Sequence, residues 1–270
     1  MRILPGNGVA PAGGSGRLSA MSDDIFDEGV AARYDESSAE MFGDDVLGPT
    51  VDFLVDLAGD GPVLEFAVGT GRVALPLSER GVEVSGIELS RAMVDRMQTK
   101  PGADRVAVTI GDMATTRVDG TFSLVYLVFN TITNLLRQDQ QVQCFRNAAA
   151  HLEPGGHFVI EVSVPRLRRL PLGETFVPFD VSSGHAGIDE FDVVRQRLTS
   201  HHYWVRQGAG QVFRSDHRYV WPAELDLMAQ LAGLTLAQRW SGWNRDPFTS
   251  ESTSHVSVWR RVSSGSDPAA

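Results

Sequence analysis

Residues 63–72, "VLEFAVGTGR", join a run of apolar residues to a turn of small ones, with an acid inside the run. The run predicts a buried β-strand, and Glu65 lies near its carboxyl end. Gly69 and Gly71 can adopt backbone angles that other residues avoid, and they let a ligand approach the main chain closely. In open α/β sheets, ligands bind outside the carboxyl ends of the strands. The stretch therefore predicts a cradle in which Glu65 accepts hydrogen bonds from a cationic or amine-bearing ligand, although a strand–helix turn without a ligand has the same pattern.

An alternation of short apolar runs with amphipathic stretches extends from about residue 45 to residue 163. It is typical of a parallel sheet whose faces are covered by helices. Pro49 and Gly59 are expected to begin and end the first helix, Ser90 to cap a later one, and "EPGG" at 153–156 to break the last helix before the next strand. The expected strands are 62–67, 82–89, 105–113, 122–130 and 157–162, and the expected helices are 49–59, 70–81, 90–100 and 139–152.

The pattern changes after about residue 166, where β-branched and aromatic residues dominate the segments 174–183, 191–205 and 211–221. The connection "RQGAGQ" at 206–211 predicts a hairpin between two of them, so a strand-rich insert is expected. The α/β body then resumes with a helix from Pro222 to Gly233. The last strands are expected at 234–242 and 255–261. The chain is expected to divide into a disordered extension (1–24), an α/β core (25–165), a β-rich insert (166–215), the rest of the core (216–262) and a disordered tail (263–270).

The composition excludes several classes of protein. A formal net charge of −10 argues against a surface that binds nucleic acids. No apolar stretch approaches the roughly 20 residues that span a bilayer, so no membrane contact is expected, and the N-terminal residues do not have the pattern of a signal peptide. The single cysteine, Cys144, excludes a disulfide framework and multi-cysteine metal sites, and we expect a buried core thiol. The expected compartment is the cytoplasm, with Met21 as an alternative start.

Two further acids stand at the ends of the next two expected strands. Glu88 ends the second strand, where a carboxylate can bind both hydroxyls of a ribose. Asp112 and Met113 end the third strand, and an acid beside a soft apolar side chain suits the amine and the ring face of an adenine. Each acid alone has the pattern of a solvated strand end. Together, at the ends of three successive strands, they indicate a nucleoside-binding site.

These motifs resemble those of the class I S-adenosylmethionine-dependent methyltransferases, especially bacterial enzymes that methylate metabolites and natural products. The resemblance covers about residues 25–165 and, more loosely, 215–260, and it rests on "VLEFAVGTG", "GIELS", "GDM" and "LEPGGHFVIEV". The chain departs from the family's G-x-G-x-G turn at Ala67, where a glycine is usual. The resemblance implies a Rossmann-like, doubly wound sheet of seven strands in which the last strand is antiparallel.

The resemblance also implies S-adenosyl-L-methionine as the cofactor. Glu65 and the loop after it would hold the methionine part, Glu88 the ribose, and Asp112 with Met113 the adenine. Phe129 and Asn130, after the fourth strand, would lie near the sulfonium and the acceptor. The implied cofactor-binding residues are Glu65, Ala67, Gly69, Thr70, Gly71, Arg72, Glu88, Leu89, Asp112, Met113, Phe129 and Asn130.

Catalytic candidates come from two other regions. Tyr34, in "VAARYDESSAEMF", resembles a tyrosine of the family's N-terminal lid helix, and packing within that helix is the alternative. His201 and His202 are candidates for a general base, as is His217, if the acceptor is a hydroxyl or a protonated amine; surface or structural roles are the alternatives. Adjacent histidines point to opposite faces of a strand, so no metal site is expected. A small-molecule acceptor is expected, with oxygen or nitrogen left open, and the insert could supply its pocket or a homodimer contact.

Three other functions share part of this sequence pattern. A nicotinamide-dependent oxidoreductase would usually carry G-x-G-x-x-G, which "AVGTGR" does not supply, and it gives no reason for "GDM". A nucleic-acid methyltransferase that acts on exocyclic amines usually has a polar residue, two prolines and an aromatic after the fourth strand, where this chain has "FNTI". A non-catalytic protein that binds S-adenosylmethionine has the same set of acids and stays open.

Overall fold

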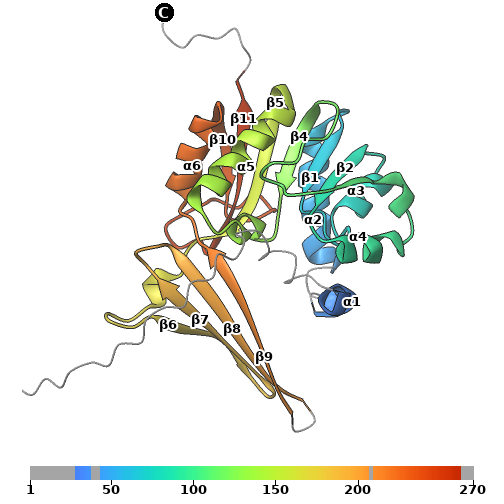
Figure 1. Cartoon of the computed structure of the whole chain (residues 1–270). Coiled ribbons are helices and arrows are strands. Elements are labelled where there is room, and N and C mark those ends of the chain that lie inside the picture. Colours follow the sequence, from blue (N-terminus) through green and yellow to red (C-terminus); the bar gives the residue numbers. More distant parts are fainter. Residues whose placement is uncertain (1–27, 38–42, 207–208, 263–270) are drawn as a thin grey trace, which may run out of the picture.

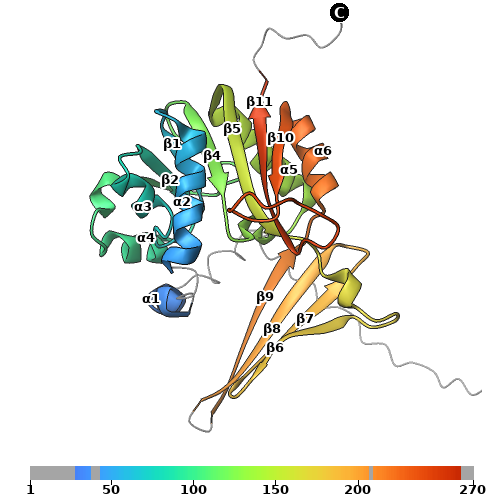
Figure 2. The same cartoon turned by 180° about the vertical axis from the view of Figure 1, so that it is seen from behind.

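The computed structural model describes residues 28–37, 43–206 and 209–262. These residues form a large sheet covered by helices on both faces and a smaller sheet that projects beyond one edge of it (Figures 1 and 2). The extension and the tail that the sequence predicts to be disordered, 1–24 and 263–270, lie outside the described residues. No helix within the described ranges is both long enough and apolar enough to cross a membrane.

The large sheet has seven strands in the order β10-β11-β5-β4-β1-β2-β3. Neighbouring strands in this sheet are parallel, except that β11 is antiparallel to both β5 and β10. The predicted fold, a doubly wound sheet whose last strand is antiparallel, is therefore confirmed. The bounds are β1 Val63–Phe66, β2 Val84–Glu88, β3 Ala107–Ile110, β4 Phe122–Leu127, β5 Leu152–Ser163, β10 Leu234–Trp240 and β11 Ser254–Arg261.

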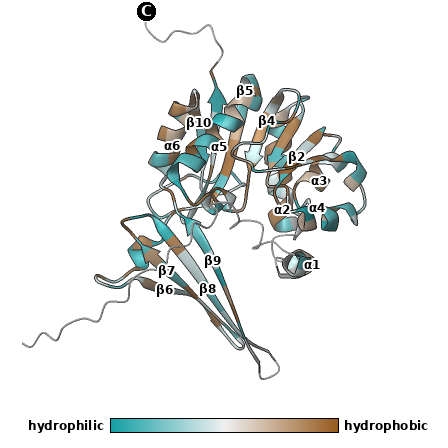
Figure 3. Ribbon diagram, in the orientation of Figure 1, coloured by the Kyte–Doolittle hydropathy of each residue, from teal (hydrophilic) through white to brown (hydrophobic). Residues whose placement is uncertain are grey.

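Helices cover both faces because each presents one apolar stripe to the sheet. The central strand β4 is largely hydrophobic, whereas α5 alternates between hydrophobic and hydrophilic residues (Figure 3). α5 and α6 pack in one core cluster, and α2, α3 and the end of α4 pack in the cluster on the opposite face. The bounds are α1 Glu28–Ser37, α2 Asp44–Ala58, α3 Ala74–Glu79, α4 Arg91–Gln98, α5 Gln138–His151 and α6 Pro222–Leu231, with short 3-10 turns η2 Ala103–Arg105, η3 Thr131–Asn134 and η4 Leu167–Arg169.

Local sequence signals account for several of these elements. The Ser90 side chain caps α4 by accepting a hydrogen bond from the Met93 N–H at 3.3 Å, as predicted. Gly59 follows α2 with a φ of 57°, a conformation that favours glycine. Cys144 is fully buried in the core of α5, and burial raises the pKa of its thiol, which confirms a structural cysteine.

The prediction that the first long helix begins at Pro49 is wrong. α2 begins at Asp44, and Pro49 lies inside it. A residue before proline normally avoids the helical region because its side chain meets the proline ring. Gly48 stands in that position and has no Cβ, which removes much of this conflict. The proline therefore lies in the second turn instead of starting the helix.

The prediction that "EPGG" separates the last helix from a strand at 157 also needs correction. β5 begins at Leu152, directly after α5, and includes these four residues. Gly155 has a φ of 88°, and a Cβ on Gly156 would lie only 2.9 Å from the carbonyl oxygen of Ser123. Because glycine permits this close approach, the irregular start of β5 can pair with β4, whose register shifts at this point.

The insert forms a second sheet of four antiparallel strands in the order β6-β7-β8-β9. The predicted hairpin is confirmed, since Arg206 at the end of β8 pairs with Ala209 at the start of β9. β7 was not anticipated, and β9 continues three residues past the boundary predicted at 215 because His217 and Arg218 still pair with β8. The bounds are β6 Phe176–Ser182, β7 His185–Asp192, β8 Arg197–Arg206 and β9 Ala209–Arg218.

Arg218 fastens the second sheet to the large one. Arg218 is 5% exposed, and its guanidinium donates to the Glu224 carboxylate at the start of α6, at 2.7 Å. It also donates to the side-chain carbonyl of Gln141 in α5 and, at 3.2 Å, to that of Gln196. The carboxylate and both amides are thereby satisfied out of water, which fixes the base of β9 against α5 and α6.

Candidate functional site

The structure brings the three predicted acids to one edge of the large sheet. β1, β2 and β3 are adjacent and parallel, so their carboxyl ends lie side by side. Glu65 is the third residue of β1, Glu88 is the last residue of β2, and Asp112 follows β3 by two residues. The second sheet and α1 lie beyond this same edge (Figures 1 and 2).

Glu65 is buried in the floor of the site. The hydroxyl of Tyr126, its neighbour on β4, donates to Oε2 at 2.8 Å, and the Ala74 N–H at the start of α3 also donates to the carboxyl. Burial raises the pKa of Glu65 to about 8, although these donors and the nearby Arg72 guanidinium favour the charged form. Burial therefore favours the protonated form of Glu65 in the ligand-free protein.

Glu88 links β2 to the loop of residues 67–72, the glycine loop. One carboxylate oxygen accepts from the Gly69 N–H and the other from the Ser90 N–H, both at 2.8 Å. Burial raises the pKa of Glu88 against the effect of these backbone donors. The Leu89 N–H also donates to the carboxylate, which has about four lone-pair sites in all and so can still accept from a ligand hydroxyl.

The loop from residue 67 to residue 72 turns sharply through left-handed backbone conformations. Gly69 has a φ of 58° and Gly71 one of 81°. A Cβ on Gly71 would lie 2.7 Å from Cγ of Met97, so no other residue fits there without repacking α4. Ala67 also has a positive φ, 56°, at the position where the resemblance expects glycine. The alanine therefore adopts the glycine conformation, and the turn keeps its form.

Asp112 and Met113 are placed differently from each other. Asp112 closes a turn, with its Oδ1 accepting from the Ala114 N–H at 2.7 Å. Met113 is 8% exposed and packs in the core beneath α5, whose Asn147 side chain donates to the Met113 carbonyl at 2.8 Å. Met113 thus faces the core more than the expected ring-binding surface.

Exposed apolar side chains lie among the acids instead. Leu89 directly follows β2, Ile110 ends β3, and Phe129 follows β4 by two residues. Their exposed fractions are 36%, 38% and 37%, although large apolar side chains are mostly buried elsewhere in the chain. Acids interleaved with apolar surfaces at the ends of the four neighbouring strands β4, β1, β2 and β3 suit a ligand that has both hydroxyl groups and a flat ring.

The turn after β4 is held by contacts that the sequence pattern did not reveal. Phe129 and Asn130 have φ values of 57° and 59°. The Phe129 N–H donates to Glu161 of β5 at 3.0 Å, and Asn130 Oδ1 accepts from the Ser163 N–H at 2.6 Å. The Arg72 guanidinium lies 5.4 Å from the centre of the Phe129 ring. The glycine loop and the turn after β4 are thus in direct contact.

Helix α1 is fastened to the glycine loop through Asp35. Its carboxylate accepts from the Thr70 hydroxyl at 2.6 Å and pairs with Lys100 at 2.8 Å and Arg96 at 3.5 Å, both in or just after α4. Burial disfavours its charge, but the hydrogen bonds from Lys100 and Thr70 outweigh burial and lower the pKa of Asp35. Sequence reasoning missed Asp35, because one acid in an amphipathic helix carries no distinguishing pattern.

Tyr34 lies beside the strand-end groups. Its side chain is half-buried, and burial raises the pKa of its phenol. The charge of Arg72 lowers this pKa, while those of Glu88 and Glu65 raise it, so the phenol is close enough to feel all three groups. The helix that was predicted to act as a lid therefore brings Tyr34 to the acids.

The two adjacent histidines lie elsewhere. His201 pairs with Glu190 at 2.9 Å on one face of the second sheet, and His202 pairs with His185 at 3.1 Å on the other. Among the described residues, the hydrogen bonds and ring contacts of both histidines are confined to this sheet. The structure therefore does not join them to the strand-end acids. His217, in contrast, reaches η3 after β4.

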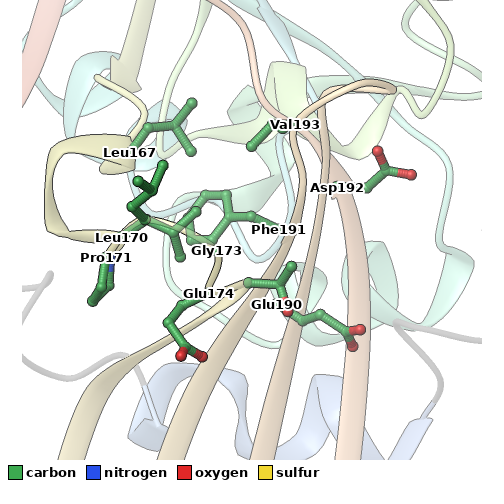
Figure 4. A pocket seen from close by; sticks show the side chains of 11 residues that line it. Leu167, Leu170, Pro171, Gly173, Glu174, Glu190, Phe191, Asp192 and Val193 are labelled. Carbon is green, nitrogen blue, oxygen red and sulfur yellow. The ribbon is translucent and has the colours of Figure 1, made fainter. Parts of the chain in front are cut away.

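A cavity of about 670 Å³ lies at the base of the second sheet (Figure 4). Leu167 and Leu170 from the η4 segment line it, together with Phe191 and the acids Glu174 and Glu190. Glu190 is also the partner of His201. Because all its lining residues belong to η4, β7 and their flanks, this cavity is separate from the group at the ends of β1, β2 and β3.

Comparisons with known proteins agree on one kind of domain. A family model described as a methyltransferase domain matches residues 63–156. The CcbJ methyltransferase from Streptomyces caelestis is similar at 38% identity and a TM-score of 0.73, over 80% of this chain and 89% of that one. The cypemycin N-terminal methyltransferase of a Streptomyces species is 26% identical, over 89% of this chain and 100% of that protein. The fold of CalS10 from Micromonospora echinaspora, an amino pentose methyltransferase solved with bound SAM, matches at 19% identity and a TM-score of 0.63, over 91% of this chain and 100% of that one.

Proposed function

The chain belongs to the class I S-adenosylmethionine-dependent methyltransferases, and we propose that it transfers the methyl group to an oxygen or nitrogen atom of a small metabolite or natural product. The proposed cofactor site is supported mainly by the row of acids and exposed apolar side chains at the ends of β1, β2 and β3. S-adenosylmethionine has the matching parts: a cationic amino acid, a ribose with two hydroxyls and a flat adenine.

Each part of the cofactor has residues that would hold it. Glu88 would bind the ribose hydroxyls with the lone-pair sites that its backbone donors leave free. The exposed faces of Leu89 and Ile110 would cover the adenine, and Asp112 would accept from its amine. The remaining predicted residues would hold the methionine part and the sulfonium: Glu65, Ala67, Gly69, Thr70, Gly71 and Arg72 in and before the loop, with Phe129 and Asn130 opposite them.

Bound S-adenosylmethionine supplies a methyl group that its sulfonium already activates. The protein then contributes alignment and exclusion of water. α1, fastened through Asp35 to Thr70, would cover the cofactor from the side of the loop. Tyr34 would lie beside the reacting groups, where its hydroxyl can orient the acceptor.

The small-molecule acceptor is supported by the relatives. The cypemycin enzyme is named for methylating an N-terminus, and CalS10 is an amino pentose methyltransferase. The net charge of −10 disfavours nucleic acid as the acceptor. A buried, unpaired cysteine suits a cytoplasmic protein, and we place the enzyme there. The exposed second sheet is the surface through which a homodimer would form, which light scattering can test.

Binding of the cofactor is the first test. Calorimetry with S-adenosylmethionine and S-adenosylhomocysteine should give micromolar affinities, with NADH as a ligand that should not bind. Transfer of labelled methyl groups should then be measured on amino sugars, peptides with a free N-terminus and phenols. Binding of NADH in place of the adenosyl ligands would overturn the cofactor site. Cofactor binding without transfer to any of these classes would overturn the proposed acceptor class.

A further inference from the structure

His217 is joined to the turn after β4 by a chain of hydrogen bonds. Its Nδ1 lies 3.2 Å from Asn134 Oδ1 and 3.4 Å from the Thr133 hydroxyl, both in η3. The Thr133 hydroxyl donates its own hydrogen to the Asn130 carbonyl at 2.7 Å, so it can only accept from His217. Asn134 Oδ1 is an acceptor as well. Nδ1 therefore carries the hydrogen of the imidazole ring.

The other ring nitrogen faces a serine. Nε2 of His217 lies 2.9 Å from the Ser215 hydroxyl, and because Nδ1 holds the hydrogen, Nε2 accepts from Ser215. Ser215, His217 and Asn134 thus form a hydroxyl, an imidazole and an amide oxygen in line. In this order the imidazole is a base for the hydroxyl, and the amide oxygen fixes its tautomer.

The serine belongs to a polar row across the second sheet. Ser215 pairs in register with Ser200, and Ser200 pairs with Asp189 on β7. The Ser200 hydroxyl donates to Asp189 at 2.7 Å. Because residues two apart on a strand share a face, His217 stands on the same face as this row. The row starts at η3, the turn that follows Phe129 and Asn130 at the cofactor edge.

We propose that Ser215 and His217 form the proton relay of the methyl acceptor, an inference that rests on the proposed function. The acceptor's N–H or O–H hydrogen passes to Ser215 Oγ while the hydrogen of Ser215 passes to His217 Nε2. The electron pair left on the acceptor atom forms the bond to the methyl carbon. The carbon–sulfur bond breaks with its electron pair on sulfur, and S-adenosylhomocysteine leaves. Ser215 ends as a neutral hydroxyl and His217 as an imidazolium.

The surroundings of the His217 imidazole favour a neutral ring before proton transfer and stabilise the imidazolium after it. Burial lowers the pKa of His217, so the free imidazole is neutral at pH 7. Three titratable groups act on it: Asp189 on β7 and Asp216 on β9 favour the imidazolium, and His202 on β8 opposes it. The η3 partners, Thr133 and Asn134, do not titrate. The ring therefore begins as a base and, once protonated, lies near two carboxylates.

The tautomer can be measured without an acceptor. Long-range ¹H–¹⁵N spectra of the full-length protein, labelled at histidine, should show His217 with a hydrogen on Nδ1 and a bare Nε2 at pH 7.5. His217→Gln assigns the signal, and Ser215→Ala should shift the Nε2 resonance. A hydrogen on Nε2, or an unshifted Nε2 resonance in Ser215→Ala, would overturn the relay.

Kinetics then separate a catalytic role from a structural one. On whichever tested amino sugar, peptide or phenol is methylated best, His217→Gln and Ser215→Ala should lower kcat about 100-fold or more. The affinity for S-adenosylmethionine should stay within twofold, and the acid limb of the rate–pH profile should disappear in His217→Gln. Ser215→Thr should restore much of the rate. Unaltered kcat in His217→Gln overturns the relay.

A control lies outside the second sheet. The Ser250 hydroxyl donates to Glu251 at 3.2 Å on the exposed segment before β11, and Ser250→Ala removes this bond away from the polar row. It should leave kcat unchanged. If S-adenosylmethionine does not bind, or no acceptor class is methylated, the proposed function fails and the relay fails with it, while the histidine spectra still test the Ser215–His217 hydrogen bond. If cofactor binding and transfer survive but His217→Gln is fully active, only the relay fails.

Discussion

The hydroxyl of Tyr126 donates to the carboxyl of Glu65, its register partner across the β1–β4 pair, at 2.8 Å in the floor of the cofactor site. Both groups are fully out of water, and burial raises the pKa of each, that of Tyr126 well above its usual value. Burial thus favours the neutral form of both groups, and an approaching cation would favour the ionised form of Glu65.

Glu65→Gln should stabilise the ligand-free protein at alkaline pH. The carboxyl has a pKa of about 8 in the folded state against an ordinary 4.5, so its contribution to stability is complete below pH 4.5 and is lost as pH rises through 8. Glutamine has no proton to lose. The melting temperature of the variant should exceed that of the wild type by about 3 °C or more at pH 9, and by less at pH 5. Glu153→Gln, at an exposed position, is the control.

The same substitution should weaken cofactor binding, because the amino acid part of S-adenosylmethionine is cationic. Calorimetry should also show that wild-type affinity rises from pH 6.5 to pH 8.5, as Glu65 ionises, and that the affinity of Glu65→Gln does not follow this rise. A variant with wild-type affinity and the same pH dependence would separate Glu65 from the cofactor.

Glu88→Ala should reduce affinity for S-adenosylmethionine by about tenfold or more, since charged hydrogen bonds contribute roughly 1.5–3 kcal/mol each. It should also lower the stability of the ligand-free protein, because the Gly69 and Ser90 N–H groups lose their acceptors. Calorimetry and urea unfolding measure the two effects. Glu83→Ala removes an exposed acid just before the same strand and should change neither. Unchanged affinity in Glu88→Ala would remove the ribose assignment.

Asp35→Asn should loosen α1. The variant keeps the size of the side chain but loses the charge that pairs with Lys100 and Arg96. Backbone amides of residues 28–37 should exchange hydrogen faster, and bound S-adenosylmethionine should dissociate faster in stopped-flow experiments. Asp45→Asn, an exposed acid at the start of α2, should leave both rates alone. Equal exchange in Asp35→Asn and wild type would show that α1 is held by other contacts.

Tyr34→Phe should slow methyl transfer more than it weakens cofactor binding. The ring still packs in α1, but the hydroxyl beside Arg72 and Glu88 is lost. Turnover on the best acceptor should be compared with the affinity for S-adenosylmethionine. A wild-type rate would leave Tyr34 with a packing role alone.

Arg218→Ala should destabilise the protein by about 3 kcal/mol or more, because Glu224 then keeps a partly buried charge without its partner. Urea unfolding gives the change in free energy. The exposed pair of Arg195 and Asp192, at 2.8 Å, is the contrast, and Arg195→Ala should change stability by less than about 1 kcal/mol. A small effect at Arg218 would mean that the second sheet is held to α5 and α6 by packing alone.

The sheet and its acids could be predicted because their signals are local. Glu65, Glu88 and Asp112 each follow an apolar run that fixes a strand end, and the parallel arrangement then brings the ends together. β7 was missed because its sequence, "HAGIDEFD", has few β-branched residues. It forms a strand because β6 and β8 pair with its backbone on both sides.

The parts of the site that escaped prediction depend on contacts between distant segments. Asp35 meets Thr70, Glu161 meets Phe129, and Asn134 meets His217 across 35, 32 and 83 positions of sequence. No periodicity or spacing in one sequence encodes such pairs. The choice among the histidines was open for the same reason, since only the path of β9 past η3 distinguishes His217 from His201 and His202.

Three residues other than glycine hold left-handed backbone conformations at this edge of the sheet: Ala67 before the glycine loop, and Phe129 with Asn130 after β4. Such conformations are disfavoured by about 1–3 kcal/mol each and persist only where the surrounding fold imposes them. The two turns are therefore preorganised by the folded protein before any ligand arrives. S-adenosylmethionine would then bind without the entropy loss of ordering these loops, and mutations that relax Ala67 would change its affinity through flexibility instead of through a lost contact.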